Sequence, residues 1–421
     1  MLQVFSSAWA LLLGMMLLQV GNGMQGTLLG VRGALEGFST AQMSVVMSAY
    51  FAGFLFGSRM APEMIRRVGH VRVFAALGSM ISAVLILYPT LADPWAWSVG
   101  RVVIGFCFSG VYVTAESWLN NSATNANRGK ALSLYMIVQM VGIVTAQGLL
   151  VLGDPSGYVL FVIPSVLVSL AFAPILLSVS PTPAFGTTKP LSLRQIMEIS
   201  PLGCVGMFLL GGVFSAQFGM APVYGAEAGL SVAEISLFVS TFFVGSLVLQ
   251  YPIGWLSDRM DRRVLICGAA AVMGVGALAG IALGNSMIPL LVSAFVIGGM
   301  SNPLYSLLIA YTNDFLDHDD MAAAAGGMVF INGLGAVTGP LVTGWLMGVI
   351  GPQGFFVVIA VLSLSITAYA AYRMTQRASP SVAQTDSYMP VSPSASPMAV
   401  EFAQEVAIET AQDDDDGVKS A

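Results

Sequence analysis

Charged residues are scarce in this chain of 421 residues. Asp, Glu, Lys and Arg make up 9% of it and apolar residues 56%, whereas soluble globular proteins carry about 25% charged and roughly 45–50% apolar residues. This composition excludes an ordinary soluble domain, so the length of the chain says nothing about a number of soluble domains.

Basic clusters, cysteine frameworks and nucleotide motifs are also lacking. The 16 basic residues form no patch of the kind that nucleic acid requires, so we expect no nucleic-acid partner. Cys107, Cys204 and Cys267 lie far apart in apolar runs and have neither metal-ligand spacing nor a paired framework. A Gly-x-x-x-x-Gly-Lys-Ser/Thr phosphate loop is missing. We therefore expect no cofactor, no metal and no ATP hydrolysis.

Long apolar runs make up most of the sequence. A helix needs roughly 20 apolar residues to cross a hydrocarbon core of about 30 Å, and open strand edges in lipid would leave backbone groups unpaired. The chain is therefore predicted to be an all-α membrane protein with twelve transmembrane helices, at residues 5–29, 40–60, 72–91, 96–119, 131–151, 157–179, 201–223, 232–254, 264–284, 286–312, 323–348 and 353–374.

The basic residues predict the orientation. With a cytoplasmic N-terminus, fourteen of the sixteen bases fall in inner loops or after the last span; Arg32 and Arg101 are the exceptions. Positive charge accumulates on the cytoplasmic side of membrane proteins. We therefore expect an integral protein of the plasma (inner) membrane, in contact with the lipid bilayer and with both termini in the cytoplasm.

The sequence repeats itself with a shift of 192–193 residues. Ser39 to Gly53 aligns with Ser231 to Gly245, and Val103 to Gly105 aligns with Val296 to Gly298. Parallel repeats of six helices with a substrate site between them are typical of one class of transporter. The predicted domains are two six-helix bundles at 1–179 and 200–374, a cytoplasmic connector at 180–199, and a tail at 375–421. The tail holds eight acids and two bases and is predicted to be disordered.

One loop carries a family resemblance. Gly254-Trp-Leu-Ser-Asp258-Arg259-Met-Asp261-Arg262-Arg263 resembles the Gly-x-x-x-Asp-Arg-x-Gly-Arg-Arg loop of the major facilitator superfamily, with Asp261 in place of the second Gly. Arg101 to Gly105 resembles that family's Arg-x-x-x-Gly pattern in the fourth span. Ala115 to Asn120 is similar to its YcaD-like branch. The resemblance covers roughly residues 1–374 and implies a transporter that works by alternating access.

The same resemblance implies gating residues at the cytoplasmic surface. Asp258, Arg259 and Arg262 are expected to form a latch that holds helices together in one access state, because charge pairs can favour one of two arrangements. The first half contains a second copy of this loop that matches the family pattern less well, and in that copy Arg67 stands at the position of the family's arginine. The alternative is that these arginines only set the topology.

Two ionisable residues are predicted inside the fourth span. Arg101 is interpreted as a cavity cation that attracts an anionic group or tunes a carboxylate, with snorkelling to the outer interface as the alternative. Glu116 lies about 22 Å further along the same helix at 1.5 Å per residue, within reach of Arg67 or Arg128. It is either a protonation site that couples transport to protons or one half of a structural ion pair.

Neutral polar residues recur at membrane depth in several spans. Under the resemblance, spans one, four, seven and ten line a central cavity; interhelical hydrogen bonding is the alternative role. The predicted cavity set, with Arg101, is Asn22, Gln25, Tyr112, Gln139, Gln217, Asn302, Tyr305 and Asn332.

The hypothesis favoured by these features is a secondary transporter of a small solute, with proton coupling left open. The alternative is a receptor or sensor on the same fold, since fold does not determine function. An intramembrane enzyme is not expected, because paired carboxylates and histidine clusters are missing at membrane depth.

Overall fold

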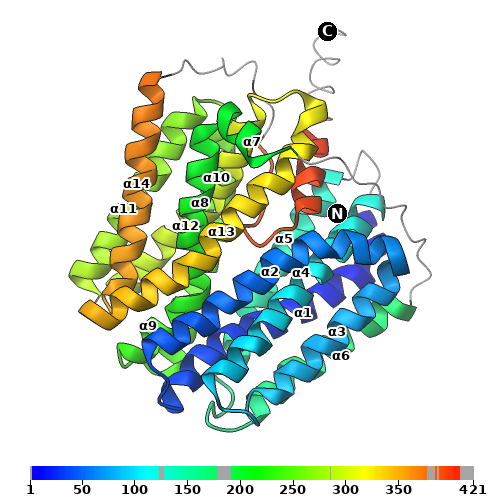
Figure 1. The fold of residues 1–421 in the computed structure, drawn as a ribbon, viewed down its shortest axis with the longest axis vertical. Helices are drawn as coiled ribbons and strands as arrows, with labels where there is room; N and C mark the ends of the chain where they lie inside the picture. Colours follow the sequence, from blue (N-terminus) through cyan, green and yellow to red (C-terminus); the bar gives the residue numbers. More distant parts are fainter. Residues whose placement is uncertain are drawn as a thin grey trace.

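The computed structural model describes residues 2–122, 128–177, 191–284, 286–376, 385 and 388–407, and over these residues it is helical (Figure 1). The first half contains α1 (Leu2–Leu35), α2 (Thr40–Val68), α3 (His70–Leu87), α4 (Pro94–Ser122), α5 (Arg128–Leu150) and α6 (Val159–Leu177). The second contains α8 (Pro201–Ser215), η2 (Ala216–Met220), α9 (Ala221–Glu227), α10 (Val232–Ser257), α11 (Arg262–Leu283), α12 (Met287–Asn313), α13 (His318–Ile350) and α14 (Gly354–Gln376).

The helices have the length and hydropathy of membrane spans. Ten helical segments within the described residues are long and apolar enough to cross a membrane. One of them, Pro201–Glu227, joins α8, η2 and α9 into one span. The helices α1 and α6 are not among the ten, although both pack within the first half. The all-helical fold is confirmed, and the number of twelve spans stays a prediction.

The internal repeat is visible in how the helices begin. Ser39 caps α2 and Ser231 caps α10; each hydroxyl accepts a hydrogen bond from a backbone N–H in the first turn. The side chains of Gln42 and Glu234 close the same capping box in return. Such caps pair the N–H groups that a helix start leaves unpaired. Matched serines therefore start matched helices in the two halves.

The repeat also places glycines where helices pack closely. At Gly53 of α2, an added Cβ would lie 2.7 Å from the backbone carbon of Val102 on α4. The aligned Gly245 of α10 would place a Cβ 3.0 Å from the backbone of Phe295 on α12. Because only glycine permits backbones to approach this closely, α2–α4 and α10–α12 form equivalent tight pairs.

The second half has one irregular span. A turn of π-helix, η2, separates α8 from α9, and the N–H of Ala221 donates to the carbonyl of Ala216 across five residues. Single π turns inside α-helices occur frequently at functional sites. This turn carries Gln217 and Phe218.

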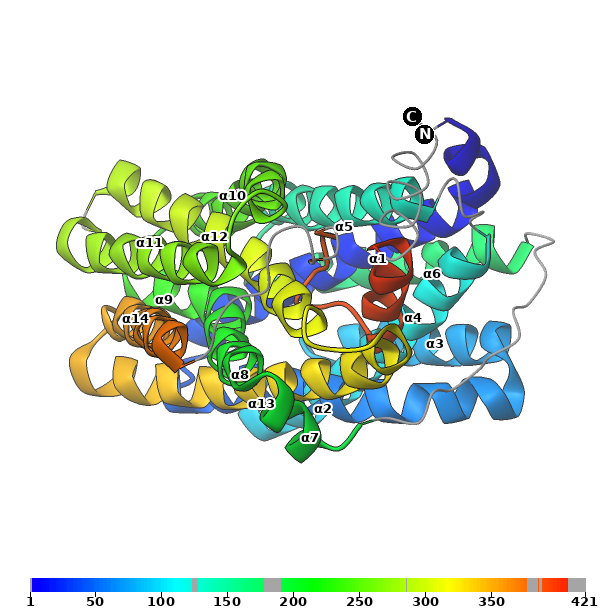
Figure 2. The ribbon, with the colours of Figure 1, turned by 90° about the horizontal axis from the view of Figure 1, so that it is seen from above.

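The halves meet differently at the two ends of the molecule. At the end near α9, they touch directly: Thr40 of α2 hydrogen-bonds Glu227 of α9, and the hydroxyl of Ser48 donates to the carbonyl of Val337 on α13 at 2.6 Å. At the other end, which we call the tail end, residues 388–407 lie between the halves. Figure 2 shows this C-terminal segment between the first half on one side and the second half on the other.

The prediction of a disordered tail is wrong for residues 388–407. Most of their side chains are buried, and residues 397–407 are helical. Apolar residues spaced along the Ser- and Pro-rich segment, including Tyr388, Val400 and Phe402, supply the buried face. The predicted connector at 180–199 also contains a helix, α7 (Leu193–Ile199), which Ser192 caps. Residues 180–190 and 408–421 lie outside the described residues.

Candidate functional site

A cavity lies between the two halves, near the middle of the molecule. Its walls come from α1, α2, α4 and α5 of the first half and from α8, η2, α10, α12 and α13 of the second, and residues Ser392, Pro393 and Ser394 of the tail cover it. The cavity volume is about 40 Å³, which is room for roughly three water molecules. In this conformation the cavity is therefore closed to any larger solute.

Five of the predicted cavity residues line this space: Asn22, Tyr112, Gln139, Asn302 and Asn332. They come from α1, α4, α5, α12 and α13 and so represent both halves. The repeat-matched pair Gln139 and Asn332 lies on opposite halves of the wall. The amide of Asn332 donates to the carbonyl of Met207 at 3.0 Å.

A chain of hydrogen bonds organises the first-half wall. The amide of Gln19 donates to Gln139 at 2.9 Å and accepts from the hydroxyl of Tyr112 at 2.7 Å. Asn22 donates to the hydroxyls of Tyr112 and Tyr50 at 3.0 and 3.2 Å. Gln19 and Asn22 stand one helical turn apart on α1 and present their amides along one face. The wall is thus polar, uncharged and pre-ordered.

Arg101 anchors this chain from behind the wall. Its side chain is buried, donates to the amide oxygen of Gln25 at 2.8 Å and lies over the ring of Tyr50 at 4.5 Å. Gln25 in turn donates to Asn22 at 3.1 Å. Arg101 is buried behind the wall and is not among the residues that line the cavity in this conformation, so its role as a cavity cation stays a prediction. It orders the wall through Gln25 and Tyr50.

Three further predicted residues lie outside the cavity lining. Gln25 is the link between Arg101 and Asn22. Gln217 accepts a hydrogen bond from Ser301 at 3.1 Å, within the second half. Tyr305 is fully buried, and its hydroxyl has no partner among the described residues.

The sequence interpretation missed the aromatic part of the site. Phe218 lies at the centre of a cluster, with ring centroids 5.9 Å from Phe214, 6.0 Å from Tyr50, 6.3 Å from Phe51 and 6.4 Å from Phe243. These rings, with Phe54, line the cavity from both halves. The aligned pair Phe51 and Phe243 was the available signal: two aromatic residues at equivalent positions of the repeat. No charged side chain belongs to the lining that the described residues form.

Glu116 is buried and does not pair with either expected arginine. Its carboxylate accepts from the hydroxyl of Tyr135 at 3.0 Å and from the backbone N–H of Ser396 at 3.2 Å, and the hydroxyl of Ser396 also donates to it. Arg67 instead pairs with Glu63 at 2.7 Å, and Arg128 pairs with Glu405 of the tail at 3.1 Å. The predicted ion pair is therefore replaced by contacts with Tyr135 and the tail.

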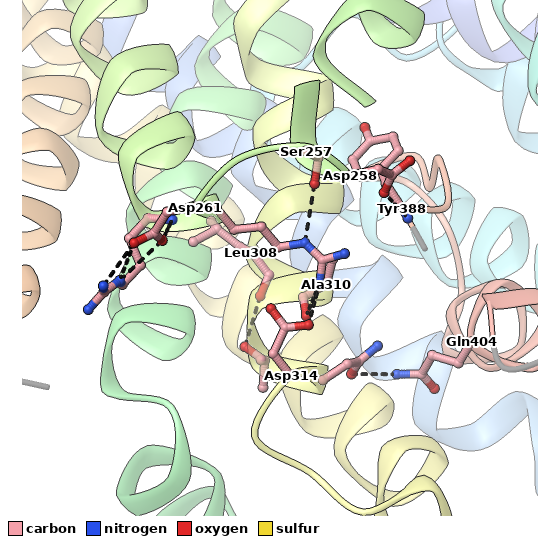
Figure 3. A network of polar contacts seen from close by, with 12 residues as sticks. Ser257, Asp258, Asp261, Leu308, Ala310, Asp314, Tyr388 and Gln404 are labelled. Carbon is pink, nitrogen blue, oxygen red and sulfur yellow. Dashed lines mark hydrogen bonds and ion pairs between the residues drawn. The ribbon is translucent and has the colours of Figure 1, made fainter. Parts of the chain in front are cut away.

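Of the predicted latch residues, Arg262 makes its contacts within the second half. Arg262 forms a buried ion pair with Asp314 and donates to the hydroxyl of Ser257 at 3.2 Å and to the carbonyl of Ala310. Figure 3 shows Ser257, Ala310 and Asp314 converging on this guanidinium. The pair ties the end of α10, the start of α11 and the end of α12 together. Asp314, 52 residues away in sequence, was not predicted as a partner.

The other latch residues have separate contacts. Arg259 stacks on Trp255 at 4.2 Å from the ring centroid and donates to its carbonyl. Asp258 accepts the backbone N–H of Tyr388 at 2.8 Å, beside the arginine network in Figure 3. Burial raises the pKa of the Asp258 carboxyl group, although the hydrogen bond from Tyr388 and the nearby arginines oppose this. Asp258 therefore binds the tail rather than serving as the latch's main anion.

Comparison with known proteins identifies the family. A sequence profile described as Major Facilitator Superfamily matches residues 11–228 and 203–395. Proteins named uncharacterized MFS-type transporter YcaD, from Escherichia coli O7:K1 strain IAI39 and O9:H4 strain HS, are 28% identical over 361 residues, covering 84% of this chain and 92% of theirs. A crystal structure of the nucleoside transporter NupG is similar in fold, with a TM-score of 0.72, 14% identity, and coverage of 86% of this chain and 98% of that one. The chain therefore belongs to the major facilitator superfamily and is a membrane transporter, not an enzyme.

Proposed function

We propose that the protein is a secondary transporter of neutral, ring-containing solutes that form hydrogen bonds, such as nucleosides. The observation that carries the proposal is the cavity lining: aromatic rings and amides from both halves, with no charged side chain among the described residues. A charged solute would lose its hydration there without a partner, which is costly. Aromatic faces favour stacking with planar rings, and the nucleoside specificity named for NupG is in keeping with this chemistry.

The transport cycle that we propose is alternating access between the halves 1–179 and 200–374. One difference between the ends supports it: at one end α2 contacts α9 and α13 with no other segment between them, whereas at the other end the tail contacts both halves. We place the tail end in the cytoplasm and the protein in the plasma (inner) membrane, because the predicted inner loops carry most of the bases.

The first test is uptake into proteoliposomes. We expect uridine or adenosine to be taken up roughly tenfold faster than their 5′-monophosphates, a difference of about 1.4 kcal/mol.

Phe218→Leu should raise the KM about two- to tenfold, because an aromatic pair contributes about 0.5–1.5 kcal/mol. Phe208→Leu is the matched control, since Phe208 lies on the same span but is 41% exposed on the outer surface. Equal uptake of charged and neutral solutes, or none above empty liposomes, would disprove the proposal.

For the driving force we propose protons, with Glu116 as the group that binds them. Its carboxyl group is buried in the fourth span, and its contacts among the described residues include no cation. In Glu116→Gln, which keeps the size of the side chain and cannot exchange a proton, a pH gradient should no longer drive accumulation. Exchange of labelled for unlabelled solute should continue at the parent rate. Accumulation that still follows the gradient in this variant would exclude Glu116 as the proton carrier.

A further inference from the structure

We infer that the tail-end opening between the halves is a peptide-binding site, and that its ligand is the chain's own residues 388–407, which close the opening as a tethered plug. This segment covers the central cavity through Ser392, Pro393 and Ser394. It also contacts both halves along its length.

The first part of the plug binds the second half in extended form. The Tyr388 hydroxyl accepts a hydrogen bond from Gln250 at 2.7 Å. The ring of Tyr388 lies against Gly254, where a Cβ would be 2.6 Å from its Cδ1. Val391 then forms two hydrogen bonds with the hydroxyl of Ser306 on α12, through its N–H at 2.9 Å and its carbonyl at 3.1 Å. A single hydroxyl on α12 thus pairs both main-chain polar groups of Val391.

The second part crosses to the first half and back. Ser396 donates to Glu116 on α4, and Glu405 pairs with Arg128 at the start of α5. Gln404 donates to Asn313 at the end of α12 at 3.0 Å. Phe402 is fully buried, as is Val400. Because one short segment binds both halves, it holds them at one separation.

The plug must leave before a solute can pass at this end. It covers the cavity from the tail end through Ser392, Pro393 and Ser394, and the space left in the cavity is about 40 Å³. The tether keeps the segment at a high effective concentration near its site, so rebinding is favoured without strong individual contacts. Opening is therefore a local equilibrium that the plug's own contacts set.

A labelling experiment tests the plug in the full-length chain. Cys107, Cys204 and Cys267 are replaced by alanine, and Ser58, which lines the cavity, is changed to cysteine as a reporter. A membrane-impermeant maleimide is added from the tail side of membrane vesicles. Phe402→Asp places a charge in a buried position, which favours the state in which the plug has left its site. This variant should therefore raise the labelling rate of the reporter cysteine roughly tenfold or more. Glu401→Gln, on the partly exposed side of the same helix, should label like the parent.

Equal labelling rates for parent and Phe402→Asp would overturn the inference. If Phe402→Asp does not insert into membranes, the combined Tyr388→Ala and Ser396→Ala variant replaces it, with the same expected result. No transported solute is needed, so these results are independent of the proposed substrate.

Discussion

Replacing Arg262 with alanine should destabilise the protein by about 3–5 kcal/mol, the cost of leaving one member of a buried ion pair without its partner. The Arg262 and Asp314 side chains are 2% and 3% exposed, so solvent cannot take over the lost contact. Arg262 also lies at the start of α11, where the helix dipole disfavours a cation, which makes Asp314 its essential counter-charge. The loss should appear as a lower midpoint in thermal or denaturant unfolding of the purified protein.

The first-half copy of the same loop supplies the control. Arg67 pairs with Glu63, but the two side chains are 75% and 41% exposed. Exposed pairs contribute about 0–1 kcal/mol, so Arg67→Ala should unfold nearly like the parent. Arg262→Ala combined with Asp314→Asn should lose less than the sum of the two single changes. If Arg262→Ala is no less stable than Arg67→Ala, the ion pair does not hold α10, α11 and α12 together.

Replacing Arg101 with methionine should lower the initial uptake rate of the neutral solute roughly tenfold or more. A buried hydrogen bond to a charged group contributes about 1.5–3 kcal/mol, and this one fixes the amide of Gln25, which in turn holds Asn22. Without it, Gln25 loses its anchor and Tyr50 loses the cation over its ring. Uptake into proteoliposomes at matched protein amounts measures the effect.

Comparing the uptake of neutral and anionic solutes shows whether Arg101 attracts the solute or positions the cavity wall. An arginine that attracts solute from the cavity wall would, when removed, change the preference between neutral and anionic solutes. An arginine that positions the wall would lower the rate and leave that preference unchanged. Arg101→Lys should restore only part of the rate, because lysine keeps the charge but not the planar fork. A shift of selectivity toward neutral solutes in Arg101→Met would contradict the positioning role.

The fold was predictable from the sequence because the bilayer imposes a simple rule. Long apolar runs must be helices in lipid, and hydropathy locates them. Residues such as Asn22 and Gln139 were also predictable as cavity lining, because a polar amide at membrane depth needs a partner or a cavity. Their hydrogen-bond partners were not, since Gln19 and Gln139 are 120 residues apart in sequence.

The rest of the site was hidden for physical reasons. A phenylalanine that lines a cavity, such as Phe218, has the same local pattern as one in a helix core, so periodicity cannot separate them. The depth of Arg101 was evident from the sequence, whereas the side of the wall on which it lies depends on packing against α1 and α2. The tail has the composition of a disordered segment. Its order comes from contacts with distant partners, such as Ser306 and Glu116, that its own sequence does not reveal.

The π turn of the seventh span has a mechanical consequence. Five residues, Ala216–Met220, occupy a turn that is wider than its neighbours, so the span contains one residue more than a regular helix of the same rise needs. Tightening that turn to ordinary α geometry would rotate the segment beyond it by about 100°. Phe218 lies within that turn, so the direction of its ring depends on the extra residue. The width of this one turn therefore determines which face α9 presents to α1 and α10.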